Sequence, residues 1–220
     1  PPDADTHPDY VPAVPGTQSV PKQERGVRPA RPVPYELEVL ADVNNATDVV
    51  KLAFANKGNG AAALQVRSGD GSNGPWTYTV GAGDHLHDSW NFAVQGKDSY
   101  DLAVYGPNGF FRAFKGGLRG KRGANLVTLP TCHHDQGITL EITSQGKRRD
   151  KVRIYDAYTN QTVTQTLEPG GVLVWHWSLD ASHGWYDLSV TMESDPLFLQ
   201  QLAGHIENGR DSVSDPLLGV

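Results

Sequence analysis

The sequence has few of the residues that would cross-link it covalently or carry it through a membrane. It contains one cysteine, Cys132, among 220 residues, which excludes an intramolecular disulfide and is compatible with a cytosolic or an exported protein. No apolar run approaches the roughly 18 residues that a membrane-spanning helix needs. The net charge is −6, so bulk electrostatics do not favour nucleic acid as a partner. The chain begins at Pro1 without a methionine or a signal-like segment, and we expect it to be a piece of a longer protein.

Motifs for catalysis and for cofactor binding are missing as well. The sequence contains no Gly-x-Ser-x-Gly elbow, no P-loop and no dinucleotide fingerprint. Its carboxylates are scattered, with no pair that can be assigned as general acid and base. The sequence therefore predicts that this chain is not an enzyme by itself and that it holds no cofactor.

Two histidine-containing stretches have the beginnings of a metal site. His85 and His87 would lie on one face of a strand, flanked by Asp84 and Asp88, and two imidazoles on one face can begin a zinc site. The sequence places no third and fourth ligand beside them. The run 132–135, Cys-His-His-Asp, alternates between the two faces of a strand, so at most two of its side chains converge. We predict no metal site.

What the sequence does contain indicates an all-β protein with an extended arm. Hydrophobic residues make up 38% of the chain, which is enough for a core, and 24 glycines and 15 prolines indicate many turns and short elements. Nine of the prolines fall within residues 1–34. Such a segment favours extended or polyproline conformation and builds no core of its own. We interpret residues 1–34 as a linker or as an arm laid across a neighbour.

From residue 35 onward the pattern is that of short antiparallel strands. Tyr100, Leu102 and Val104 alternate with less apolar residues, as expected of a strand with one buried face. Gly106-Pro107-Asn108-Gly109 follows as a tight turn, because proline pre-sets φ while asparagine and glycine tolerate positive φ. About seven such strands fit into the first half of the chain, the number and spacing of a small antiparallel β-sandwich.

The strand pattern occurs twice. Residues 138, 140 and 142 repeat the apolar residues 50, 52 and 54 after 88 positions, and the Tyr-Asp-Leu-x-Val of residues 100–104 returns at 186–190. A period near 87 is the size of a domain, so it indicates a tandem duplication rather than a solenoid. We predict two tandem immunoglobulin-like antiparallel β-sandwich domains, residues 35–120 and 121–208, between the proline-rich arm of residues 1–34 and a C-terminal tail of residues 209–220.

The two copies differ in one strand. In the first copy His85, His87 and Ser89 occupy one face of that strand, where the second copy has Val172, Val174 and His176. The second copy is therefore apolar on both faces of the strand, which fits a central buried strand or a packed interface between the copies. We favour the interface.

Cationic residues gather in two places that would suit a contact with anionic lipid headgroups. Such a contact is worth about 1 kcal/mol per cation near the surface. The alternative is that these residues are solvated hairpin tips and a basic linker between the domains. The candidate lipid-surface contacts are Arg112, Lys115, Arg119, Lys121, Arg122, Lys147, Arg148 and Arg149.

Four aromatic residues of the second copy are candidates for a binding site. Trp175, Trp177, Trp185 and Tyr186 could form a box for a quaternary ammonium group or a face that stacks on a sugar. Aromatic residues that alternate along a sandwich strand also belong to the core in many proteins, and this alternative stays open.

Several stretches in sequence resemble one family. Residues 21–37, PKQERGVRPARPVPYEL, are similar to the segment that precedes the C-terminal region of bacterial phosphocholine-preferring phospholipases C of the Pseudomonas and Burkholderia type. Residues 104–110, VYGPNGF, resemble a motif of the first of their two tandem C-terminal domains. Residues 184–190, GWYDLSV, and the ending 203–209 with 214–216 resemble the second. The resemblance covers essentially the whole chain.

The resemblance implies a parent enzyme with an upstream catalytic domain of the phosphatase type, which hydrolyses phosphatidylcholine or sphingomyelin. No catalytic residue can be carried over, because none of that domain's motifs is present. The family also implies export in the folded state, hence a secreted or periplasmic location. We expect a non-catalytic C-terminal region whose partners are its own upstream catalytic domain and a phospholipid membrane surface. The alternatives are a carbohydrate-binding module that uses Trp76 or Trp185, and a purely structural scaffold.

Overall fold

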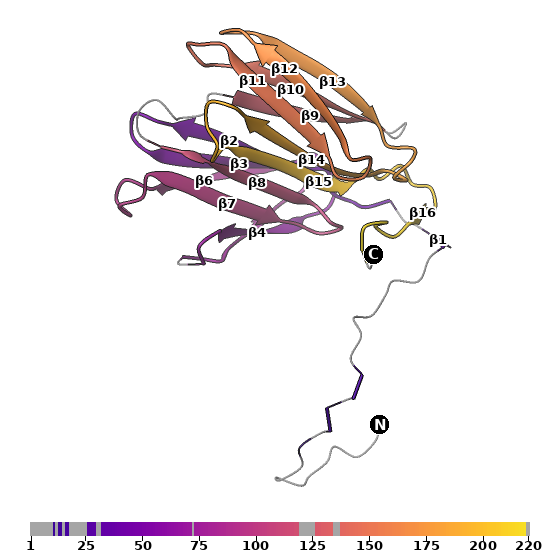
Figure 1. Ribbon diagram of the computed structural model, residues 1–220. Coiled ribbons are helices and arrows are strands. Elements are labelled where there is room, and N and C mark those ends of the chain that lie inside the picture. The colour runs from indigo at the N-terminus through magenta and orange to yellow at the C-terminus, as the bar shows by residue number, and fades with distance from the viewer. Residues whose placement is uncertain are drawn as a thin grey trace.

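The computed structural model of the chain describes residues 11, 13–14, 16–17, 26–29, 32–71, 73–118, 126–133 and 137–218. The regular secondary structure of these residues consists of β-strands, which confirms the predicted all-β class. No helix of the described part is long and apolar enough to cross a membrane. Figure 1 shows the described strands arranged as two packed halves.

The first half is a sandwich of two antiparallel sheets. One sheet has the order β2-β3-β6, and the other contains β5-β4-β7-β8. The chain therefore crosses between the sheets after β3, β5 and β6, as in immunoglobulin-like folds. Its strands are β2 (Leu37–Asn44), β3 (Val49–Asn56), β4 (Ala62–Ser68), β5 (Trp76–Val80), β6 (His85–Asn91), β7 (Ser99–Tyr105) and β8 (Phe111–Gly117).

The second half repeats this arrangement strand for strand. One sheet has the order β13-β10-β9, and the other contains β12-β11-β14-β15. Its strands are β9 (Leu126–His133), β10 (Gly137–Ser144), β11 (Asp150–Asp156), β12 (Gln161–Leu167), β13 (Val172–Ser178), β14 (Trp185–Met192) and β15 (Leu199–His205).

Each half has its own hydrophobic core, built from the alternating residues that the sequence pattern marks. Val50, Leu52 and Phe54 on β3 are completely buried, as are the equivalent residues 138, 140 and 142 on β10. Each such side chain contributes about 1.5–3 kcal/mol through its removal from water. The central strand of each three-stranded sheet therefore anchors its sandwich.

The halves join through backbone hydrogen bonds between β8 and β15. These last strands of the two copies pair antiparallel, with Lys115 opposite Leu199 and Phe111 opposite Ala203. The pairing fuses two four-stranded sheets into one eight-stranded sheet, β12-β11-β14-β15-β8-β7-β4-β5. In the other layer β2 and β9 approach each other without forming a shared sheet.

This arrangement corrects one prediction from the sequence. The apolar strand 172–178 was expected at the interface between the copies, but β13 lies at the outer edge of its own sheet. Val172 and Val174 on its outer face are 53% and 58% exposed. The expected interface was wrong because the copies associate edge to edge through β8 and β15 and not face to face through β13.

Because β8 and β15 run antiparallel, equivalent loops of the two halves point to opposite ends of the molecule. We call the end with the β7–β8 turn and the last residues of β15 the arm end, since β1 (Val27–Arg28) pairs there with β16 (Ser212–Val213) of the tail. The opposite end carries the β10–β11 turn, residues 145–149, and the β14–β15 turn. We call it the tip end.

Candidate functional site

The junction of the halves encloses Arg112, which sequence reasoning placed at a lipid surface. Its side chain is only 2% exposed. Its Nη1 donates hydrogen bonds to the carbonyl oxygens of Phe111 at 2.8 Å and Ala203 at 3.0 Å, and its Nη2 donates to the Tyr186 hydroxyl at 3.2 Å. The guanidinium also lies 4.3 Å from the ring centre of Phe110. Arg112 therefore ties the halves together, and its inclusion among the lipid contacts was wrong because β8 is an interior strand of the fused sheet.

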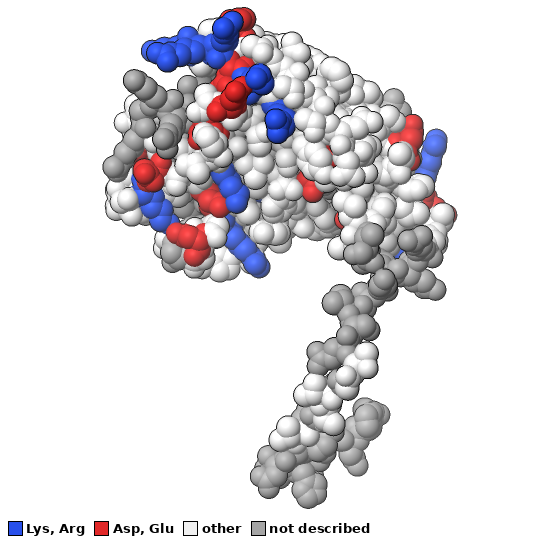
Figure 2. Space-filling view, in the orientation of Figure 1, with Lys and Arg blue, Asp and Glu red and all other residues white. Residues whose placement is uncertain are grey.

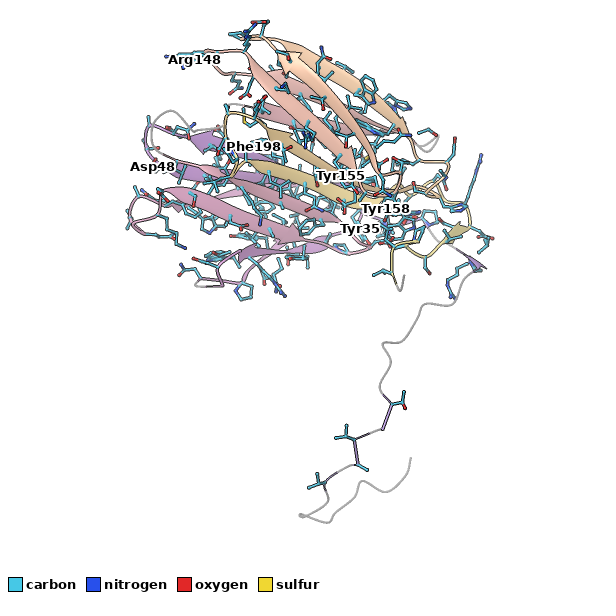
Figure 3. All side chains as sticks on the ribbon, in the orientation of Figure 1. Tyr35, Asp48, Arg148, Tyr155, Tyr158 and Phe198 are labelled. Carbon is cyan, nitrogen blue, oxygen red and sulfur yellow. The ribbon has the colours of Figure 1, made fainter. Side chains whose placement is uncertain are left out.

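A groove of about 270 Å³ opens beside Arg112 at the arm end. Its walls come from both halves and from the segment that enters β2, which includes Tyr35; Figure 3 labels Tyr35 at this end of the molecule. Glu36 and Glu207 also line the groove. Burial and the nearby Glu207 carboxylate raise the pKa of Tyr35, so this phenol is neutral near pH 7.

Cys132 lies in the same groove and has the features of an unreactive thiol. The residue is exposed, yet the surrounding protein displaces enough water to raise the pKa of its thiol. The Arg112 guanidinium lowers that pKa, but by less than burial raises it. A thiol with a raised pKa carries little of the nucleophilic thiolate at neutral pH. The groove thus has no activated nucleophile at this position.

The basic residues of the β10–β11 turn are placed as a surface contact requires. Lys147, Arg148 and Arg149 are all exposed, and Figure 2 shows Lys and Arg side chains projecting at the end where Figure 3 labels Arg148. We call these three residues the basic tip. Among the neighbouring acids, Asp150 bonds Ser194 and Glu193 pairs with Lys151, so both have partners outside the tip.

The other predicted cations are not part of this tip. Lys115 pairs with Asp101 at 2.9 Å on the outer face of the eight-stranded sheet. Arg119, Lys121 and Arg122 lie outside the described residues.

The structure does not bring the four candidate aromatic residues into one box. Trp175 and Trp177 lie together on β13 with ring centres 6.2 Å apart, and Trp177 is 7% exposed. Trp185 on β14 stacks beside His205 at 4.6 Å and donates its Nε1–H to the carbonyl of Val213 at 2.9 Å. Tyr186 is 4% exposed and holds Arg112.

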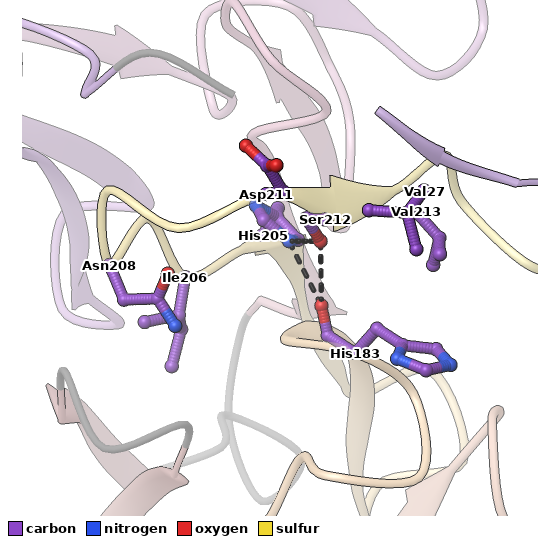
Figure 4. Close-up of a pocket in the computed structure, with 8 residues that line it drawn as sticks. All are labelled: Val27, His183, His205, Ile206, Asn208, Asp211, Ser212 and Val213. Atoms are coloured by element: carbon purple, nitrogen blue, oxygen red, sulfur yellow. Dashed lines mark hydrogen bonds between the residues drawn. The ribbon is translucent and has the colours of Figure 1, made fainter. Parts of the chain in front are cut away.

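Trp185 instead helps to fix the C-terminal tail. Figure 4 shows the small pocket, about 60 Å³, where the tail and β1 meet the second half. The Ser212 hydroxyl donates to the carbonyl of His183, which also accepts from His205 Nε2 at 3.0 Å. His205 Nδ1 faces the Glu207 carboxylate at 2.9 Å.

The described histidines of the candidate metal stretches belong to no cluster of potential metal ligands. No group of three or more potential metal ligands occurs among the described residues. His133 and His176 both contact the Thr139 hydroxyl, at 2.9 and 3.1 Å. Residues 134–136 lie outside the described part of the chain.

Residues 29–117 and 126–205 match the family model of the bacterial phospholipase C, C-terminal domain. The chain belongs to this family. The two matched ranges each cover one copy of the duplicated sandwich, and the family is the phospholipase C C-terminal region that the sequence predicted.

Relatives of this phospholipase C C-terminal domain come from two bacterial genera. The chain is 43% identical over its full length to a non-hemolytic phospholipase C of Burkholderia pseudomallei. It is 37% identical over 95% of its length to a non-hemolytic phospholipase C of Pseudomonas aeruginosa, and 33% identical over 92% to a hemolytic one from the same species. The chain spans about a third of the length of these relatives, 31–32%.

Sequence reasoning missed the contact between the halves at the arm end. The Asn108 amide donates to the Glu207 carboxylate, and Gly109 lies against the Trp185 ring. The turn at 106–109 could be predicted from the sequence. The residues that it contacts, Trp185 and Glu207, lie about 80–100 positions further along the chain. Only the β8–β15 register brings the two together.

Proposed function

We propose that this domain presents a phospholipase C to lipid surfaces, with the basic tip as its contact. The observation that carries the proposal is the exposure of Lys147, Arg148 and Arg149 at the end of the molecule opposite the arm. The fused sheet separates the two ends, so a surface contact at the tip does not obstruct the segment that leads into the arm. Cations near an anionic surface are attracted by about 1 kcal/mol each.

Several observations support this role in preference to catalysis or glycan binding. Cys132 has a raised pKa, and no ligand cluster for a metal occurs in the described residues. The glycan alternative depended on Trp76 or Trp185. Trp76 packs edge-on against the buried Trp90 at 5.4 Å, and Trp185 is held by the tail. A secreted or periplasmic location and action beside a catalytic domain that hydrolyses choline phospholipids are parts of the same proposal.

Co-sedimentation of the 220-residue chain with vesicles tests the proposal. We expect binding to phosphatidylcholine vesicles that contain anionic lipid, and weaker binding as salt is raised, because exposed charges are screened within about 10 Å at 0.1 M salt. Arg148→Gln should weaken binding about fivefold, the equivalent of roughly 1 kcal/mol.

Lys57→Gln is the matched control, because Lys57 is exposed at the arm end, where it pairs with Glu38. This substitution removes one positive charge far from the tip and should leave binding unchanged. Absence of binding at low salt, or equal losses for the two variants, would contradict the proposal.

A second role, support of the remaining part of the enzyme, is favoured by one observation. The arm is held on the tail by the β1–β16 pairing and by the hydrogen bond from Arg28 Nε to Ser214 at 3.2 Å. A chain that enters through this clamp arrives in a defined direction relative to the second half. We therefore propose that the clamp orients an upstream catalytic domain.

A further inference from the structure

The outer edge of the second half carries an apolar stripe next to the basic tip. Val172 and Val174 on the outer face of β13 are 53% and 58% exposed, and Trp175, which lies on the opposite face in register with the buried Leu140, is 42% exposed at the sheet edge. β13 pairs with β10 on one side, and in the described residues no strand pairs with its other side. β13 also contains no Asp, Glu, Lys or Arg, although natural edge strands are commonly protected by charges. An exposed, uncharged apolar edge of this kind marks an interaction surface.

The first half provides an internal comparison. β6 is the equivalent edge strand, and its outer face carries His85 and His87 at the positions of Val172 and Val174. Two copies of one fold thus share an edge strand but differ in its polarity. The fold itself does not require valines there, since the first half forms the same sheet with exposed histidines. The apolar stripe therefore has a role that belongs to the second half alone.

The stripe is continuous with the basic tip. Ser144, just before the tip, donates its N–H to the carbonyl of Gly171 at 2.9 Å and accepts from Gly170 at 3.0 Å. The first residue of β13, Val172, therefore lies directly beside the turn that carries the cations. On the other side of the tip, Leu197 is 51% exposed, and its turn is bound to Asp150 through Ser194. Cations at the tip end are thus flanked by the exposed aliphatic side chains of Val172 and Leu197.

We infer that the β13 stripe, Val172, Val174 and Trp175, is the apolar part of a lipid-interface contact whose charged part is the basic tip. The inference rests on the proposed lipid-surface function and names the surface that carries it out. Anionic headgroups complement the tip, and tryptophan favours the boundary between headgroups and acyl chains. Apolar contact and charge attraction add in surface binding of this type.

The depth of the contact is limited by two features of the sheet. The unpaired backbone of an edge strand must stay hydrated, because an unsatisfied peptide group in hydrocarbon costs several kcal/mol. Glu141 on the neighbouring strand β10 is the cross-strand partner of Val174, so the two side chains lie on the same face of the sheet. Both features restrict the stripe to the headgroup region, with only the valine methyls and the Trp175 ring reaching the acyl chains.

Tryptophan fluorescence of the chain mixed with anionic phosphatidylcholine vesicles tests this inference. The structure describes all five tryptophans, and among them Trp175 is exposed while the other four are buried or partly buried. We expect a blue shift on binding and quenching by lipids brominated near the headgroup end of the acyl chain. Both signals should disappear in Trp175→Phe, while binding to the vesicles is retained.

A charge-neutral double variant, Val172→Thr with Val174→Thr, keeps the β-branched shape and removes the apolar surface. It should weaken vesicle binding about tenfold, and the loss should persist at high salt, unlike that of Arg148→Gln. The matched control is His85→Thr with His87→Thr, which places the same residues at the equivalent positions of the first half. This control should bind as the unchanged chain does.

The outcomes separate the two proposals. If the double threonine variant binds fully while Arg148→Gln loses affinity, the tip is the whole contact and the inference about β13 is wrong. If sedimentation velocity shows a dimer that the double threonine variant abolishes, and Trp175 shows no blue shift with vesicles, β13 is an interface between copies and the inference is overturned. If no vesicles bind at low salt, the lipid-surface function itself fails.

Discussion

The duplicated sandwich assigns different chemistry to equivalent residues, and two aspartates show this most directly. Asp101 on β7 pairs with Lys115 at 2.9 Å. Its counterpart Asp187 on β14 has no such cation and accepts a hydrogen bond from Gln201 at 2.8 Å. Burial raises the pKa of Asp187, and the nearby Asp156 carboxylate adds to the effect. The same fold position thus holds a carboxylate paired with a cation in one half and a partly buried carboxylate with a raised pKa in the other.

Asp187→Asn should stabilise the protein at neutral pH and have no effect in acid. A carboxyl with a raised folded-state pKa binds its proton more tightly in the folded state than in the unfolded state. Stability is therefore lost as the pH rises through the ordinary carboxyl range, and the loss is complete above the folded pKa. Asparagine can keep the bond from Gln201 and carries no charge. Urea unfolding at pH 7 and at about pH 3, below the ordinary Asp pKa, measures the difference.

Asp101→Asn is the control for this prediction. It removes an exposed ion pair, worth about 0–1 kcal/mol, so it should leave stability at pH 7 unchanged or slightly lower. A loss of stability in Asp187→Asn at pH 7 would mean that its carboxylate makes a favourable contact that outweighs its burial.

At the scale of elements, the β7–β8 turn is both a local structure and a contact between halves. Asn108 and Gly109 have positive φ values of 54° and 75°, which the local sequence predicts. A Cβ on Gly109 would lie 2.9 Å from Cζ3 of Trp185. Glycine is needed there both for its backbone conformation and for the close approach of the second half.

Gly109→Ala should therefore cost more stability than a positive-φ glycine alone explains. Gly96→Ala is the matched control, because Gly96 has a similar φ of 70° and no atom within 4 Å of the added Cβ. We expect about 1 kcal/mol for Gly96→Ala from strain, and about 1–2 kcal/mol more for Gly109→Ala, since Trp185 is held by Val213 and cannot move freely. Thermal unfolding of the two variants measures the difference. Equal costs would show that Trp185 yields to the added methyl.

At the scale of the whole molecule, the fused eight-stranded sheet makes two sandwiches into one body. The β8–β15 ladder crosses the boundary, and the buried Arg112 guanidinium bonds groups of both halves. Buried charges that lose their partners are costly, so the halves have little independent freedom to unfold. A rigid body with its clamp at one end and its cations at the other is what the proposed surface contact requires.

The intact chain should unfold in one cooperative transition. Arg112→Met keeps an unbranched, apolar side-chain stem and removes the guanidinium that donates to the Tyr186 hydroxyl and to two carbonyls. We expect a loss of about 2–4 kcal/mol. Lys115→Met, on the same strand but in an exposed ion pair, should cost under about 1 kcal/mol. Calorimetry compared with urea unfolding followed by tryptophan fluorescence checks both; two separate transitions in the unchanged chain would contradict the fused-sheet interpretation.

The sequence by itself determined the strands, the turn chemistry and the duplication, because each depends on residues close together in the chain. The alternation of Tyr100, Leu102 and Val104 marks a half-buried strand in any tertiary context, and a period near 87 follows from comparing the chain with itself. The family resemblance likewise came from short motifs. Those local signals were enough for the all-β class and for the family.

Only the tertiary structure decided how the copies meet and which charged residues reach solvent. Arg112 and Arg148 look alike in sequence, yet one is buried in the junction and the other projects from the tip. Val174 looked like part of an interface between copies and is instead exposed on an outer edge. The reason is that the β8–β15 pairing depends on backbone edges, whose hydrogen-bonding groups are the same for every sequence. Side-chain pattern therefore marks which face of a strand is buried, and the three-dimensional arrangement decides what covers it.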